Sequence, residues 1–378
     1  MNRTGTANLP LHGGKAPLWL TGRMQNLARE ITNIIIEEYG PANFLARLSD
    51  PYWFQALGCA LAYDWHSSGV TTVVTGILKT ALNPEQHEVA LCGGKGKTSR
   101  KTPNDIQSIT TKWNFPQQTI DQLLHTSRII AKVDNNAIQA GYQLYHHTFL
   151  ITKQGDWAVI QQGMNTQTST ARRYHWHSQT TQTFTEEPNN NIACNIKHDQ
   201  TLNMVAKESH ATRKASIDLA KEPPKKLEKL LQAATKPPNQ TSLQMWLPTK
   251  TDEPWLQTQT NLNMPRNINW DTLSRLYEFQ PQNYEELLSV KGVGPATVRG
   301  LALVAELIYG EKPSWEDPVK FSFAYGGKDG VPFPVERKAM DESIEILKKA
   351  IQEAKIGEKE KLQSLQNLRQ LIPTPKTK

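Results

Sequence analysis

Apolar residues recur at helical spacing through the first hundred residues of the chain. Between residues 17 and 39 they return every three or four positions, and Gly40 is placed to end the helix that this pattern predicts. A short apolar stretch at residues 87–92 indicates a strand. Further helices are expected over residues 51–63 and 70–83 and from residue 102.

The pattern changes to strands after residue 140. Aromatic and β-branched residues fill positions 142–152, Gln154-Gly155 forms a turn, and positions 157–162 continue the same composition. This arrangement predicts a β-hairpin, with residues 171–177 as a third strand. The first 178 residues are therefore expected to form a helix-rich α+β domain with an antiparallel hairpin sheet.

Residues 179–241 are polar and rich in Gln, Thr, Asn and Lys, which predicts a partly helical linker. Residues 242–378 are expected to form an all-α domain, with helices over 270–279, 283–288 and 296–309 and a tail helix over 337–371. The fold class predicted for the whole chain is α+β.

Two of these C-terminal helices flank the glycine turn Val290-Lys291-Gly292-Val293-Gly294-Pro295. The glycines allow backbone N–H groups to approach a phosphate at the positive end of a helix dipole. The turn resembles the helix-hairpin-helix of DNA repair and recombination proteins, which implies contact with the DNA backbone and no sequence specificity. The predicted DNA-binding residues are Lys291, Gly292, Val293, Gly294 and Arg299.

That resemblance also limits the chemistry expected here. In the helix-hairpin-helix glycosylases with lyase activity, a nucleophilic lysine stands two places beyond the second glycine, where this chain has Ala296. These enzymes also use an aspartate beyond the second helix, and Asp317 matches that position only loosely. The hairpin is therefore interpreted as a clamp, with any reaction in the first domain.

A second glycine-rich segment, residues 93–101, follows the strand expected at residues 87–92. Its Gly-Lys-Thr sequence suggests a P-loop, but Leu91 stands where a P-loop has its first glycine, five residues before Gly96. A phosphate-binding loop is the alternative interpretation, since glycine N–H groups lie beside several cations. The predicted phosphate-binding residues are Lys95, Lys97 and Arg100, together with Arg172, whose neighbours Tyr174 and Trp176 add aromatic faces.

Catalytic groups are sought among the polar residues of the first domain. Histidine transfers protons near neutral pH, lysine can form a Schiff base, and histidines with a carboxylate could hold a divalent metal ion. The spacing of these residues matches no metal-binding motif, so no metal ligand is assigned. The candidates are His12, Lys15, Asp64, His66, His146 and His175.

Charge and cysteine content narrow the class of protein. The net charge is +7 and the isoelectric point about 9.1, which suits an acidic partner such as nucleic acid. The chain has 3 cysteines and no CxxC pair, so neither a zinc site nor a disulfide framework is predicted. No apolar run reaches the length of a membrane span, and a cytoplasmic protein is expected.

Several segments together resemble a prokaryotic family, found in archaea and bacteria, that is known as a domain of unknown function. The resemblance covers nearly the whole chain and implies that both ends act as one unit, without implying a reaction. It rests on residues 3–5, 9–15, 64–72, 92–103, 144–147, 161–165, 172–176 and 323–330.

The sequence favours a DNA-processing enzyme, of nuclease or of glycosylase/lyase type, that holds DNA with the hairpin. Two alternatives stay open. One is a non-catalytic nucleic-acid-binding module that recruits protein partners through the linker and tail helix. The other is an enzyme that acts on RNA.

Overall fold

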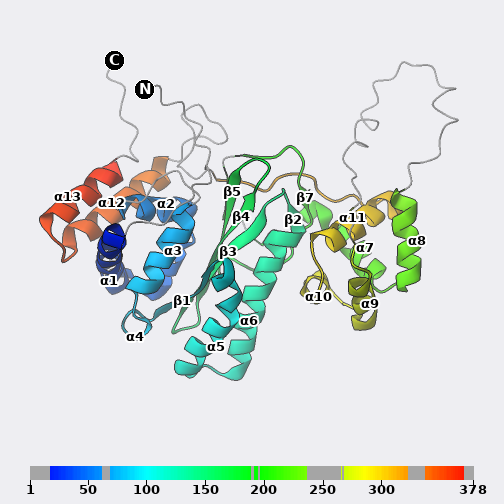
Figure 1. Cartoon of the computed structure of the whole chain (residues 1–378), viewed down its shortest axis with the longest axis horizontal. Coiled ribbons are helices and arrows are strands. Elements are labelled where there is room, and N and C mark those ends of the chain that lie inside the picture. The colour runs from blue at the N-terminus through cyan, green and yellow to red at the C-terminus, as the bar shows by residue number, and fades with distance from the viewer. Residues whose placement is uncertain are drawn as a thin grey trace, which may run out of the picture.

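The computed structural model describes residues 18–61, 69–188, 191–194, 196–235, 265, 268–321 and 337–369. Within them the predicted α+β class is confirmed, with helices packed on both sides of an antiparallel sheet (Figure 1). None of the described helices is both long and apolar enough to cross a membrane.

The first helical stretch ends at Gly40, as the sequence predicted, and a second stretch follows it. Helix α1 runs over Leu18–Leu48, and Gly40 interrupts it with non-helical angles (φ 82°, ψ 164°). Pro41 follows at once, and a proline fits the first turn of a helix because its fixed φ is already helical. Gly40 therefore ends one helical stretch and a second begins, where the sequence had predicted only an end. The other N-terminal helices are α2 (Pro51–Ala60), α3 (Gly69–Ala81) and the short α4 (Pro84–His87).

The main sheet has the strand order β1-β3-β4-β5-β6, and every neighbouring pair is antiparallel. The predicted hairpin is confirmed as β3 and β4, and the predicted third strand as β5. The strands are β1 (Val89–Lys95), β3 (Gln143–Thr152), β4 (Trp157–Asn165), β5 (Thr170–His177) and β6 (Asn191–Ala193). A separate pair joins β2 (Ile138–Gln139) to β7 (Leu202–Asn203).

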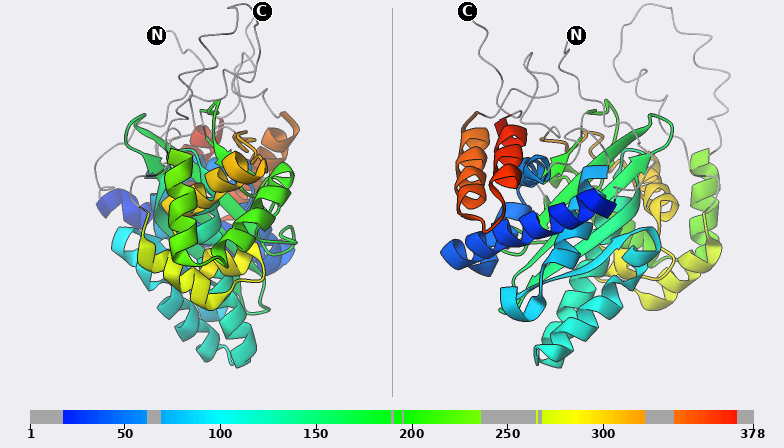
Figure 2. Two further views of the ribbon diagram at one scale, coloured as in Figure 1. Left: turned by 90° about the vertical axis from the view of Figure 1, so that its right-hand side faces the viewer. Right: turned by 60° about the vertical axis from the view of Figure 1, so that its left-hand side comes forward.

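Side chains alternate between the two faces of this sheet, and each face has its own core. Phe149, Val159 and Trp176 belong to one hydrophobic cluster. We call it the hairpin-side core, because it also contains Val293 of the glycine turn at residues 290–295. Leu150 and Ile160 belong to another, the N-terminal-side core. Figures 1 and 2 show the two sets of helices on either side of the sheet.

The hairpin-side core is formed with helices from the middle and late parts of the chain. They are α5 (Thr102–Lys112), α6 (Gln117–Lys132), α7 (His210–Ala220), α8 (Pro224–Thr235), α9 (Trp270–Phe279), α10 (Tyr284–Ser289) and α11 (Pro295–Tyr309). The N-terminal-side core is formed with α1, α2, α3, α12 (Arg337–Glu353) and α13 (Glu358–Arg369).

This packing differs from the division expected at residues 178 and 241. Helices α7 and α8, from the expected linker, bury Leu219, Leu227 and Leu231 in the hairpin-side core and pack against α11. The polar composition of the segment reflects one solvated face of each helix, while the apolar face is buried. The tail helix expected over residues 337–371 is instead two helices, α12 and α13, which pack on α1 and α2.

Candidate functional site

The conformation of the turn between α10 and α11 is explained by a helix cap and by a glycine with positive φ. Asn283 caps α10, and its side chain accepts the N–H of Glu286 at 2.9 Å. The N–H of Val293 then donates to the carbonyl of Val290 at 3.2 Å, and Gly292 has φ 99°. A positive φ at the third position of a turn favours glycine, since other residues are strained there. The two helices flank the turn where the sequence predicted them.

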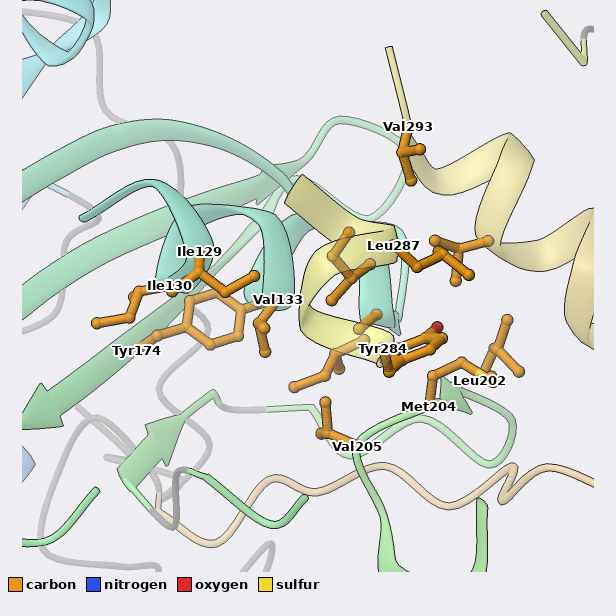
Figure 3. Close-up of a cluster of buried hydrophobic side chains, with 14 of the residues drawn as sticks. Ile129, Ile130, Val133, Tyr174, Leu202, Met204, Val205, Tyr284, Leu287 and Val293 are labelled. Atoms are coloured by element: carbon orange, nitrogen blue, oxygen red, sulfur yellow. The ribbon is translucent and has the colours of Figure 1, made fainter. Parts of the chain in front are cut away.

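The tip of this turn faces solvent. Lys291 and Gly292 are exposed, Gly294 is half-buried, and Val293 is buried beside Leu287. Figure 3 shows Val293 and Leu287 directed into the cluster that contains Val133 of the segment after α6. The apolar side of the turn therefore anchors it, and the backbone of the glycines is left at the surface.

The residues that lead into α11 include unsatisfied donors. Gly294 is the N-cap residue and provides no side-chain cap. Among the described residues, the N–H groups of Gly292 and Gly294 donate to no acceptor. Free N–H groups at the start of a helix attract anions, because they carry the positive end of the helix dipole.

Cationic side chains hold the carbonyls of the same turn. The Arg275 guanidinium donates to the carbonyl of Lys291 at 2.8 Å, and Lys132 Nζ donates to that of Val293 at 2.6 Å. Asn136 Nδ2 also donates to the carbonyl of Val293, at 3.2 Å. Both carbonyls are therefore hydrogen-bonded, whereas the N–H groups of Gly292 and Gly294 are not, and the exposed Lys291 and Arg275 lie beside them.

One of the predicted cationic contacts needs correction, and another stays a prediction. Arg299 is half-buried, and its guanidinium lies over the Trp315 ring, 5.3 Å from the centroid, so its contact with DNA stays a prediction. Arg172 is fully buried, pairs with Asp317 at 2.6 Å and lies 4.5 Å from the centre of the Tyr142 ring. Arg172 therefore joins β5 to the segment after α11 and is not a surface phosphate contact.

A 3₁₀ helix, η1 (Gly96–Lys101), follows β1. Lys97 and Arg100 are exposed on it, and Lys95, the last residue of β1, is exposed beside it. The N–H group of Gly93, in β1, is not available to a phosphate. The N–H of Gly93 donates to Asp105 at 2.9 Å, and Asp105 pairs with Lys79 at 2.7 Å. A carboxylate therefore occupies the side of Gly93 that a P-loop turns toward a phosphate.

Four of the catalytic candidates, His12, Lys15, Asp64 and His66, lie outside the described residues. His146 and His175 are buried on the sheet face that packs against α1, α2 and α3. His146 Nε2 contacts the hydroxyls of Thr75 and Thr148 at 3.1 and 2.9 Å. His175 Nδ1 donates to the carbonyl of Leu48 at 3.0 Å.

Burial decides the charge of both histidines. It lowers the pKa of His146 to about 3, with the neighbouring His147 and Lys95 adding to the effect, and it holds the pKa of His175 well below its usual value. Both rings are therefore neutral at pH 7. Among the described residues, His146 Nδ1 and His175 Nε2 have no hydrogen-bond partner.

The structure does not bring these histidines together with the turn between α10 and α11. The turn belongs to the hairpin-side core, whereas His146 and His175 are on the opposite face of the sheet. The sheet thus separates them from any ligand on the turn. No three His, Cys, Asp or Glu side chains within the described parts of the chain are placed to hold a metal ion.

A network that the sequence did not reveal lies under the turn. The Ser127 hydroxyl and His147 Nε2 are 2.9 Å apart, and His147 Nδ1 contacts Gln161 Oε1 at 2.7 Å. Gln161 donates in turn to Asp134, which also accepts from Trp176 Nε1 at 2.7 Å.

Asp134 is fully buried, and burial raises its pKa to about 7 although hydrogen bonds from Trp176 and Gln161 oppose the shift. It lies in a π-helical turn, η2 (Val133–Ala137), whose Asn136 contacts Val293. In the sequence this carboxyl stands beside the polar Asn135 and Asn136, and no local pattern could show its partners.

Comparison with known proteins identifies the family. The family described as "Protein of unknown function (DUF763)" matches residues 5–335, so the chain belongs to it. No curated protein and no solved structure matches the chain.

Proposed function

We propose that this protein binds nucleic acid, with DNA as the expected form, through the phosphate backbone at the turn of residues 290–294. The proposal is carried by the uncapped start of α11, where the N–H groups of Gly292 and Gly294 have no acceptor among the described residues. A phosphate oxygen satisfies such donors and interacts favourably with the helix dipole. Lys291 and Arg275 are exposed beside them and add positive charge.

Contacts of this kind are made to phosphate, so binding is expected to be independent of base sequence and sensitive to salt. The net charge of +7 supports the same partner, because it favours approach of a polyanion. The exposed cations Lys95, Lys97 and Arg100 are proposed as a secondary contact on the same strand.

The test compares two charge reversals by fluorescence anisotropy with labelled DNA. Lys291→Glu is expected to weaken binding at least about tenfold, since it replaces an attractive charge beside a phosphate by a repulsive one, and to lower the salt slope by about one. Lys348→Glu is the matched control, because Lys348 is exposed on α12, on the far side of the sheet. Equal affinities of the two variants would contradict the proposal.

We further propose that the bound DNA is processed, by a nuclease or a glycosylase/lyase reaction. The described residues give this proposal less support than the binding proposal, because His146 and His175 are buried on the other face of the sheet. DNA with an abasic site, treated with borohydride with and without a chelator, separates the two chemistries. A trapped covalent adduct indicates a lyase, and chelator-sensitive cleavage indicates a metal-dependent nuclease.

A further inference from the structure

A groove of about 840 Å³ lies beside the amino-terminal half of α6. Polar side chains of the helix form one wall, and the β3–β4 turn with Trp157 and Phe184 forms the other. The wall residues used below are Gln118, Asp121, Gln122, His125, Trp157 and Phe184.

The aromatic wall belongs to a series of stacked rings that ends in Phe184. Trp157 is stacked on buried Phe149 with centroids 6.1 Å apart, and Phe184 is stacked on Trp157 at 6.4 Å and 27°. Both Trp157 and Phe184 are half-buried, so part of each ring faces the groove. Half-exposed aromatic rings of this kind stack with the flat face of another ring at little cost, because they are already held in place.

The opposite wall favours a neutral ring over a phosphate. Asp121 presents a carboxylate, which repels a phosphate but accepts a hydrogen bond from an exocyclic amino group. Gln118 and Gln122 can both donate and accept at the edge of a heterocycle. Stacking rings on one side and mixed donors and acceptors on the other are the features that recognise a nucleobase.

One side of α6 connects this groove to the turn between α10 and α11. His125, at the groove, contacts Glu285 of α10 at 2.6 Å, and Lys132, seven residues later, contacts the carbonyl of Val293 at 2.6 Å. Arg128 lies between them on the same side of the helix, since residues three and seven apart share a face, and it is exposed. A strand held at the turn thus has a cation on its path to the groove.

The distance between the groove and the turn also suits a short stretch of single strand. Helix α10, which contacts His125 at the groove and leads into the turn, has 6 residues and is therefore about 9 Å long at the rise of an α-helix. A stacked strand advances about 3.4 Å per nucleotide, so roughly three nucleotides cover it.

We propose that the groove holds an unstacked nucleobase of a single strand whose backbone is bound at residues 290–294 and passes Arg128. This inference rests on the proposed function and names its substrate class, a single-stranded or locally opened nucleic acid. Phe184 is the stacking residue, Trp157 supports its ring from behind, and Asp121 and Gln122 contact the edge of the base.

The test uses two probes, a short deoxyadenylate oligomer and an abasic oligomer of the same length, in anisotropy titrations of the full chain. The base-containing oligomer is expected to bind about 5- to 150-fold more tightly, which corresponds to about 1–3 kcal/mol of stacking. Phe184→Leu keeps the apolar volume but removes the ring, so it is expected to reduce this ratio and to leave the affinity for the abasic oligomer unchanged.

Two further variants make the result decisive. Gln122→Trp changes an exposed position, fills the groove without altering the core, and is expected to reduce the same ratio even if Phe184→Leu fails to fold. Tyr309→Leu removes an exposed ring at the end of α11, outside the groove, and is expected to leave the ratio unchanged.

Equal binding of the two oligomers, with both weakened by Lys291→Glu, would overturn the base-binding groove and leave the proposed function standing. Failure of both oligomers to bind would overturn the proposed function itself.

Discussion

Each face of the central sheet buries a titratable group whose pKa is displaced by burial. On the hairpin side, Asp134 is a carboxyl whose pKa burial raises to about 7, and η2 connects it to the turn of residues 290–294. On the N-terminal side, His146 is a base whose pKa burial lowers to about 3, and its ring contacts hydroxyls of α3 and β3. Of these two groups, Asp134 is the one that η2 connects to the exposed turn of residues 290–294.

Breaking the buried ion pair between Arg172 and Asp317, on the hairpin side, is expected to lower the stability of the fold more than any other change proposed here. Asp317→Ala leaves Arg172 charged and fully buried without its carboxylate partner, which costs about 3–5 kcal/mol of unfolding free energy. Chemical denaturation measures the change. Glu358→Ala removes the pair between the exposed Glu358 and Lys361 and is expected to change stability by less than about 0.5 kcal/mol. A similar small loss for Asp317→Ala would mean that the pair does not hold this face together.

The turn itself is tested by Gly292→Ala. A Cβ there would lie 2.4 Å from Thr272 Oγ1, and φ is +99°, so the substitution combines strain with a clash. A loss of about 2–3 kcal/mol is expected in thermal or chemical unfolding. Gly310→Ala has φ +76° and no atom within 4 Å of the added Cβ, so it measures strain alone and should cost about 1–2 kcal/mol. If Gly310→Ala costs as much, the close approach to Thr272 has no energetic weight.

The difference in protonation between the faces predicts a pH dependence. Because the pKa of Asp134 is raised from 3.8 to about 7, this group favours folding below pH 3.8 and loses that contribution as the pH rises through 7. Asp134→Asn is neutral at every pH and can still accept from Trp176 and Gln161. The stability of the variant relative to the native chain is therefore expected to rise between pH 4 and pH 8, by on the order of 1 kcal/mol or more. Denaturant titrations across this range measure it, and a constant difference would show that Asp134 is ionised when folded.

The smallest expected effect concerns the second basic segment. Lys97 is exposed on η1, which is proposed only as a secondary contact, so Lys97→Gln should weaken DNA binding less than about threefold and lower the salt slope by at most one. Salt titrations of affinity measure both quantities. A loss as large as that of Lys291→Glu would make η1 the principal contact and the turn a secondary one.

Much of the local structure could be predicted from the sequence, but the pairing of distant groups could not. Gly292 and Asn283 act through their own backbone neighbourhood, so the turn between α10 and α11 was predictable. Arg172 looked like a surface cation, because strand alternation alone does not reveal that Asp317, 145 residues later, lies against it. The contact of Gln161 with Asp134 could not be predicted either, because the two residues are 27 positions apart in the sequence.

The sequence by itself determined the α+β class, the three central strands of the sheet and the glycine turn that precedes α11, since each depends on periodicity or on the φ of single residues. Only the tertiary structure decided which face each polar side chain occupies and what it contacts. The turn stays exposed and His146 is enclosed because the chain places α10 and α11 on one side of the sheet and α1 to α3 on the other. That placement arises from burial of apolar area summed over the whole chain, which no local pattern contains.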